Sequence, residues 1–227
     1  MRSWIVLGVA ALCGSCIGAG EGEVRGTVSV PLCGVMFPSM VPGQPVGAAY
    51  QRSLNFFAAE RTGRALQFRA QFGSGNAEYT DHLYFRIDDA DALRAQIAAS
   101  GETDPVTGAR QLTVPVGPQG APGVLVHGYF VLRWSCGRQR ASRLGINLSL
   151  PAVSGTMVLR SVDGGINDPE RLTDVSSFRL VYDDPRPIGD PAPTGFLPTD
   201  RMGHAELSGN FRFRYSRALP AQGFPGT

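Results

Sequence analysis

The feature that most constrains the fold of this chain is an alternation of apolar and polar residues with a period of two. Residues 66–72 read LQFRAQF and residues 83–87 read LYFRI. Successive side chains of a strand point to opposite faces, so this pattern is typical of strands with one face in a core. It predicts about ten strands, at residues 24–30, 54–59, 66–72, 83–87, 112–116, 124–134, 144–150, 157–162, 178–182 and 205–215.

Glycine and proline separate these segments. The 227 residues include 29 Gly and 17 Pro, and they cluster where a strand has to end, as at 61–63, 73–76, 117–123 and 163–165. With 43% hydrophobic residues the chain has enough apolar surface for a core, which excludes wholesale disorder. Short strands separated by turns predict a β-sandwich or a barrel, and we expect an all-β, antiparallel β-sandwich.

One helix is predicted from Ala90 to Ser100. Asp88 or Asp89 is the expected N-cap, Leu93 and Ile97 share one face, and Gly101 follows the last turn. A single helix does not supply the regular strand–helix alternation of a parallel α/β sheet. The sandwich is therefore expected to carry one short helix.

The N-terminus has the layout of a secretory signal. A cationic start with Arg2 precedes an apolar run from Trp4 to Leu12, and small residues follow. The segment 12–16, LCGSC, resembles the lipobox of bacterial lipoproteins, although Cys13 stands where that family expects Leu. The resemblance implies that Cys16 is acylated and becomes the mature N-terminus, and that the protein is held at the outer membrane. The alternative is cleavage after Ala19, which would release a soluble protein.

The expected organisation follows from this resemblance. Residues 1–15 are the signal peptide, 16–23 a flexible Gly-containing tether, and 24–227 a single domain with a Pro-rich loop at 183–203. We expect that loop to cross the domain surface before the last strand. The other interpretation is that it lets the last strand complete the sheet of another chain.

Two cysteines would remain in the mature domain. Cys33 and Cys136 each follow a predicted strand, and two leftover cysteines in an exported protein suggest one disulfide. The alternative is a pair of separate buried thiols.

Charge and composition exclude several functions. All 21 basic residues counted as Lys or Arg are Arg, so no mechanism that needs an amine is open to the chain. A net charge of +2 is too small to suggest nucleic acid. There is no Gly-rich nucleotide motif and no Gly-x-Ser-x-Gly nucleophile motif, and we expect no cofactor.

Acidic residues at strand ends are the most informative polar feature. Loops of sandwich domains can gather carboxylates around Ca²⁺, and the weak candidates are Asp88, Asp89, Asp163, Asp168, Asp183 and Asp184. Helix capping and turn formation explain the same residues. His82, His127 and His204 lie in separate predicted strands, and we interpret them as strand-surface residues.

These observations favour an exported, lipid-anchored protein of the bacterial envelope with a binding or structural role over an enzyme. The membrane is its first partner, through the lipid, and an envelope protein or a glycan is a candidate second one. Two alternatives remain open. One is an exported hydrolase whose site is assembled from scattered Asp, His and Arg, and the other is an extracellular adhesion or carbohydrate-binding module.

Overall fold

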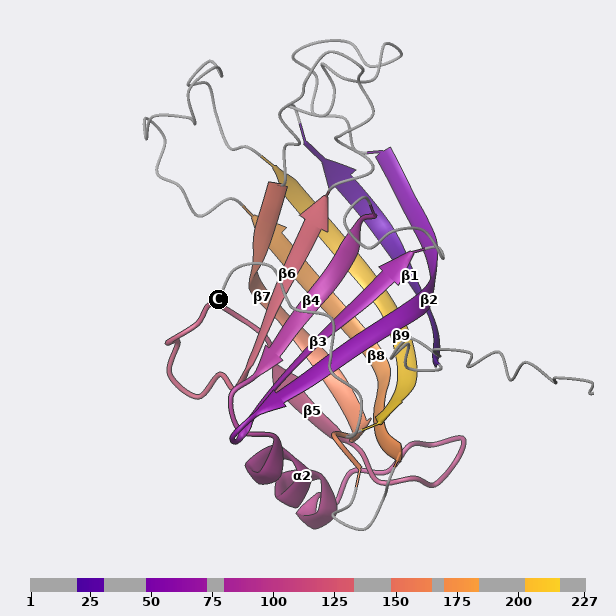
Figure 1. Cartoon of the computed structure of the whole chain (residues 1–227), viewed down its shortest axis with the longest axis vertical. Coiled ribbons are helices and arrows are strands. Elements are labelled where there is room, and N and C mark those ends of the chain that lie inside the picture. The colour runs from indigo at the N-terminus through magenta and orange to yellow at the C-terminus, as the bar shows by residue number, and fades with distance from the viewer. Residues whose placement is uncertain are drawn as a thin grey trace, which may run out of the picture.

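The protein is an antiparallel β-barrel with one helix at one end (Figure 1). The structure is a computed structural model of the whole chain, and it describes residues 20–30, 48–72, 80–132, 148–164, 170–183 and 203–216. The elements are β1 (Gly20–Ser29), β2 (Ala48–Thr62), β3 (Ala65–Phe72), β4 (His82–Ile87), α2 (Ala90–Ala99), β5 (Leu112–Pro115), β6 (Val126–Leu132), β7 (Leu148–Ser161), β8 (Glu170–Asp183) and β9 (His204–Ser216).

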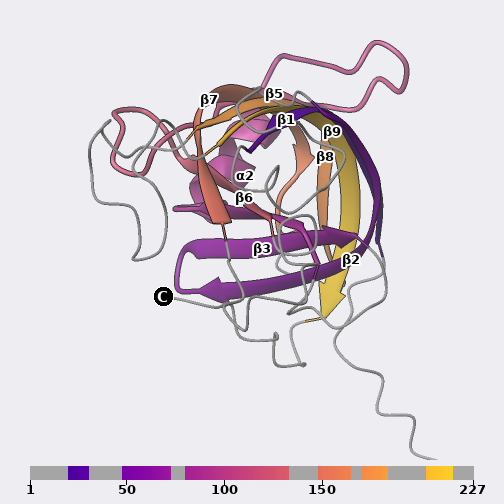
Figure 2. The ribbon, with the colours of Figure 1, turned by 90° about the horizontal axis from the view of Figure 1, so that it is seen from above.

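Eight of the strands form a closed ring. Going round it, the order is β1, β2, β3, β4, β6, β7, β8 and β9, and each neighbouring pair is antiparallel. Figure 2 shows the ring from above. The short strand β5 pairs with β7 beyond the part of β7 that pairs with β6. Apart from β5, each strand pairs with the strand that precedes it in the sequence, so the barrel is an up-and-down meander.

The prediction of an all-β antiparallel fold with one helix is confirmed, but the β-sandwich is wrong. β1 pairs with β2 along one edge and with β9 along the other, from Gly20 opposite Phe213 to Ser29 opposite His204. The last strand therefore closes the sheet on the first. A sandwich and a barrel have the same alternation along each strand, so the pattern of side chains could not separate them.

The predicted start of the domain, at residue 24, is also too late. β1 begins at Gly20, so residues 20–23 belong to a strand and not to a flexible tether. Gly20 and Gly22 face the rings of the barrel interior, and a β-carbon on either would lie 2.5 Å from the Cβ of Phe213 or of Phe211. Here glycine permits a close approach of the strand and an aromatic side chain. The same glycines, judged from composition alone, predicted a flexible tether.

Aromatic rings fill the interior of the barrel. Phe57 stacks on Phe213 with ring centroids 5.0 Å apart, and Phe68 stacks on Phe85 at 5.1 Å. Phe211 contacts both pairs. An eight-stranded barrel is just wide enough for its side chains to fill it. A ligand is therefore expected at an end or on the outer surface.

Nine strands are described where about ten were predicted. The predicted strands at 144–150 and 157–162 are one strand, β7, because the chain continues through Pro151 and Gly155. A register shift against β8 between Ala152 and Ser154 bends β7 there without ending it. The last strand, β9, pairs with β1 and β8 of the same chain, with Asp183 at the end of β8 opposite His204 at the start of β9. The Pro-rich loop predicted to cross the domain surface between them lies outside the described residues, apart from its ends.

The helix α2 follows β4 and covers one end of the barrel, which we call the helix end (Figure 1). Asp89 is its N-cap, and its carboxylate accepts a hydrogen bond from the Ala92 N–H at 2.9 Å. Leu93 and Ile97 are buried, as predicted. In the part of the chain that the structure describes, no helix has the length and apolar character to cross a membrane.

Candidate functional site

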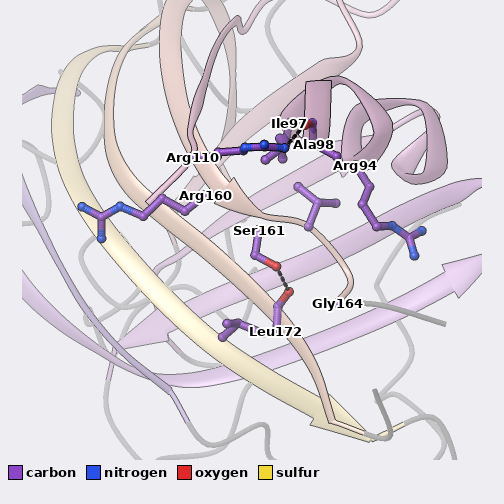
Figure 3. A pocket seen from close by; sticks show the side chains of 9 residues that line it. Arg94, Ile97, Ala98, Arg110, Arg160, Ser161, Gly164 and Leu172 are labelled. Carbon is purple, nitrogen blue, oxygen red and sulfur yellow. Dashed lines mark hydrogen bonds between the residues drawn. The ribbon is translucent and has the colours of Figure 1, made fainter. Parts of the chain in front are cut away.

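A groove of about 310 Å³ lies at the helix end, between α2 and the strands β7 and β8 (Figure 3). Its floor is apolar and is formed by Ile97 of α2, Val162 after β7 and Leu172 of β8. Ser161 also lines the groove, and its hydroxyl donates a hydrogen bond to the Leu172 carbonyl at 2.9 Å, which ties β7 to β8. A volume of this size is at the small end of the range for small-molecule sites.

Three arginines surround this floor. They are Arg94 of α2, Arg110 before β5, and Arg160 near the end of β7. No acidic side chain is among the described residues that line the groove. The guanidinium of Arg110 is directed toward Ala98, while those of Arg94 and Arg160 point away from the groove, so the positive charge lies around the apolar surface (Figure 3).

Two of these arginines have carboxylate partners just outside the groove. Arg94 pairs with Asp91, three residues earlier on α2, and Arg160 pairs with Asp104. Asp104 also accepts hydrogen bonds from the Thr107 and Val106 N–H groups, at 2.7 and 2.9 Å. The Thr107 N–H and the Arg160 guanidinium hold the pKa of Asp104 well below its usual range. Asp104 is thus ionised whenever the groove is at neutral pH.

Arg110 is different from the other two. Its guanidinium donates a hydrogen bond to the carbonyl of Ala98, in the last turn of α2. That turn has no basic residue of its own, so Arg110 satisfies a carbonyl and complements the helix dipole from outside the helix. It forms no ion pair with any carboxylate of the described residues.

The chemistry that this groove supports is binding. Its one hydroxyl side chain, Ser161, donates to a backbone carbonyl and has no base beside it among the lining residues. Nucleophilic catalysis needs a base within hydrogen-bond reach of the nucleophile. A guanidinium group at the edge of an apolar surface suits an anion with an apolar body.

The predicted calcium candidates have partners of another kind. At the helix end, Asp88 accepts a hydrogen bond from Arg86 at 2.9 Å and lies 2.9 Å from Nε2 of His127, while Asp89 pairs with Arg64 at 3.1 Å in addition to capping α2. Burial opposes ionisation of Asp88, but the hydrogen bonds from His127 and Arg86 outweigh it and lower the pKa of Asp88.

Asp163 is fully buried at the helix end. Its carboxylate accepts hydrogen bonds from Arg171 at 2.7 and 2.8 Å and also from Arg61 and Tyr215. Arg61 also contacts Asp91, the partner of Arg94. The network therefore connects the barrel interior with the first turn of α2 and, through Asp91, with one arginine of the groove.

Asp183 lies at the opposite end of the barrel, 3.9 Å from Nδ1 of His204. Asp168 and Asp184 lie outside the described residues, as do the four cysteines. Among the residues with described positions, no group of three or more His, Cys, Asp or Glu could hold a metal ion. The structure brings Asp88, Asp89 and Asp163 to one end, each with a cationic partner, and leaves Asp183 at the other.

The histidines differ from the prediction of strand-surface residues. His127 and His82 are buried, with 1% and 2% of their surface exposed, and only His204 is partly exposed. Nδ1 of His127 lies 2.9 Å from the Gly117 carbonyl, while Nε2 faces Asp88. Both ring nitrogens thus face oxygen atoms within hydrogen-bond distance.

The groove arginines were missed in the sequence because no local pattern connects them. They come from a helix, a loop and a strand, at positions 94, 110 and 160.

A scan of protein-family models and searches of curated proteins and of solved structures found no match to this chain.

Proposed function

We propose that this protein is a lipid-anchored binding protein of the bacterial envelope, and that the groove between α2 and β7–β8 is its ligand site. The signal-like N-terminus and the lipobox-like segment ending at Cys16 support export and anchoring. The packed barrel interior supports a scaffold that binds at its surface. The ligand is acidic and small.

The observation that carries the binding role is the lining of the groove. Arg94, Arg110 and Arg160 surround an apolar floor with no carboxylate among the lining residues described. A cleft whose lining carries charges of one sign attracts ligands of the opposite charge. An acidic ligand is the occupant that this lining favours.

Anchoring is tested by replacing the candidate lipid site. Cys16→Ser should move the protein from the membrane fraction to the soluble fraction, because the hydroxyl cannot carry the thioether-linked lipid. Cys13→Ser, three residues away in the same segment, is the matched control and should leave the protein in the membrane fraction. A Cys16→Ser protein that fractionates as the wild type does contradicts lipid anchoring at this residue.

The binding role is tested separately. Replacing the three groove arginines together with Gln should abolish binding of small organic anions, followed by calorimetry on the purified protein. The control replaces Arg25 and Arg179, which are exposed on the outer faces of β1 and β8. Equal binding by both proteins contradicts a ligand site at the groove.

A further inference from the structure

We infer that the ligand of the groove is a small monocarboxylate with an apolar body, and that Arg110 is the residue that binds its carboxylate. This inference rests on the proposed binding function of the same groove. It is carried by the partners of the three arginines, the floor between them, and the direction of each guanidinium.

The charge of the site selects a monoanion. Arg94 and Arg160 are each paired with a carboxylate, from Asp91 and Asp104. Asp91 is shared with Arg61, and Arg110 is the lining arginine that has no carboxylate partner among the described residues. A singly charged ligand matches the single charge of Arg110, whereas a dianionic phosphate ester brings a second negative charge near the carboxylates of Asp91 and Asp104.

The uncompensated charge belongs to Arg110. Its side chain is exposed, and its contact within the described residues is the hydrogen bond to the Ala98 carbonyl. Figure 3 shows its guanidinium directed toward Ala98 at the groove, while those of Arg94 and Arg160 point away from the groove on opposite sides. The fork of N–H groups on a guanidinium matches the two oxygens of a carboxylate, which makes Arg110 suited to a bidentate contact.

The apolar body is selected by the floor. Ile97 and Val162 are buried, with 6% and 0% of their surface exposed, whereas among the other lining residues Leu172 is partly exposed and Ala98 is exposed. An alkyl or aromatic group placed against Leu172 and Ala98 removes apolar surface from water. A ligand with only a carboxylate, such as formate, cannot use this contact.

The test compares three probes with one apolar body: hexanoate, hexyl phosphate and hexan-1-ol. Binding at neutral pH is measured by calorimetry on the full chain carrying Cys16→Ser. We expect the wild type to bind hexanoate most tightly of the three probes. Hexan-1-ol lacks the carboxylate and Arg110→Gln lacks the guanidinium, so the charge-assisted hydrogen bond is lost in both cases. The affinity of the wild type for hexan-1-ol, and of the variant for hexanoate, should each be weaker by about tenfold or more. Gln can still donate to the Ala98 carbonyl, and the melting temperature confirms that the variant is folded.

Two further variants locate the effect. Arg110→Lys keeps the charge but loses the fork, and should fall between the wild type and Arg110→Gln. Arg179→Gln, on the exposed face of β8, should bind hexanoate as the wild type does.

The outcomes separate this inference from the proposed function. If none of the three probes binds, the ligand site itself is wrong. If hexyl phosphate binds as tightly as hexanoate or more tightly, the groove is a ligand site but the monocarboxylate inference is overturned. Unchanged hexanoate binding by Arg110→Gln overturns the role of Arg110 alone.

Discussion

The hydroxyl of Tyr215 donates a hydrogen bond to the buried carboxylate of Asp163 at the helix end of the barrel. Tyr215 is on β9 and Asp163 follows β7, so the contact joins two strands that flank β8. Burial, and then the neighbouring Asp163, raises the pKa of Tyr215, which keeps the phenol protonated and able to donate. Arg171 and Arg61 complete the set of donors around the carboxylate.

Asp163→Asn should therefore be strongly destabilising. The amide is close in size to the carboxylate but leaves Arg171, whose side chain is only 10% exposed, without its counter-charge. Removing one partner of a buried pair costs about 3 to 5 kcal/mol. Asp163 has φ +56°, a conformation that Asn tolerates, so the substitution tests the charge without adding backbone strain. Urea unfolding monitored by circular dichroism measures the change.

The matched control is Asp91→Asn, which removes a partner of the same Arg61. Asp91 has 49% of its side chain exposed, and exposed pairs contribute less than about 1 kcal/mol. A loss of stability for Asp163→Asn no larger than that for Asp91→Asn would falsify the role of the buried carboxylate.

Gly22→Ala tests whether the first strand belongs to the barrel. A β-carbon at Gly22 would lie 2.5 Å from the Cβ of Phe211 and 2.6 Å from the Asn210 carbonyl oxygen, so β9 or β1 must shift. Overpacking of this kind costs about 1 to 3 kcal/mol. Gly101→Ala is the control, because nothing lies within 4 Å of a β-carbon there. Equal melting temperatures for the two variants would show that residues 20–23 do not pack in the barrel.

Much of the strand content was predictable because alternation depends only on which face of a strand is buried. Leu66, Phe68 and Ala70 point into the barrel just as they would point into a sandwich. Closure was not predictable, since it depends on β1 pairing with β9 across most of the chain. Gly20 and Gly22 are typical of a tether in the sequence, and only Phe213 and Phe211 show why glycine is required.

The candidate site was less predictable than the fold. The cap of α2 is a local signal, and the sequence narrowed it to Asp88 or Asp89, of which Asp89 is the cap. Arg110 acts on α2 from a loop beyond the helix, and Arg160 reaches Asp104 from β7, so both depend on tertiary packing. The acidic residues that looked like calcium ligands are described instead as partners of arginine or histidine, except where they lie outside the described residues.

The hydrogen bonds to Asp88 predict part of the acid sensitivity of the fold. The folded protein lowers the pKa of Asp88 from its ordinary value of 3.8, so the unfolded chain binds a proton more readily. Stability from this group is present above the unfolded pKa and is lost as the pH falls below about 4. Asp88→Asn should therefore have a shallower loss of unfolding free energy between about pH 4 and pH 2, measured by urea unfolding.

His127→Gln provides a second measurement of the same contact. It removes the imidazole that donates to Asp88, so it should also reduce the loss of unfolding free energy at acid pH. Arg86 still donates to Asp88 and keeps part of the effect. Because His127 is buried and also faces the Gly117 carbonyl, we expect a loss of about 1 to 3 kcal/mol at neutral pH as well. If both variants lose as much unfolding free energy at acid pH as the wild type does, the contacts of Asp88 do not contribute to the acid sensitivity.

The disulfide between Cys33 and Cys136 stays a prediction, and the barrel gives it a geometric basis. Cys33 comes four residues after the end of β1 and Cys136 four residues after the end of β6. Both strands run toward the end opposite α2, because β2, β3 and β4 lie between them in antiparallel order. The same order places the two strand ends on opposite sides of the ring.

Eight strands spaced ~4.8 Å apart and tilted by ~40° give a ring roughly 16 Å across. Four extended residues reach ~13 Å, so two such arms are long enough to meet over the ring. Closing a loop of about 100 residues stabilises a fold by up to ~4 to 5 kcal/mol in the chain-entropy model. Mass spectrometry of the unreduced, exported protein should show a crosslinked peptide containing both cysteines, and reduction should lower the melting temperature. Two freely alkylated thiols in the unreduced protein would contradict the disulfide.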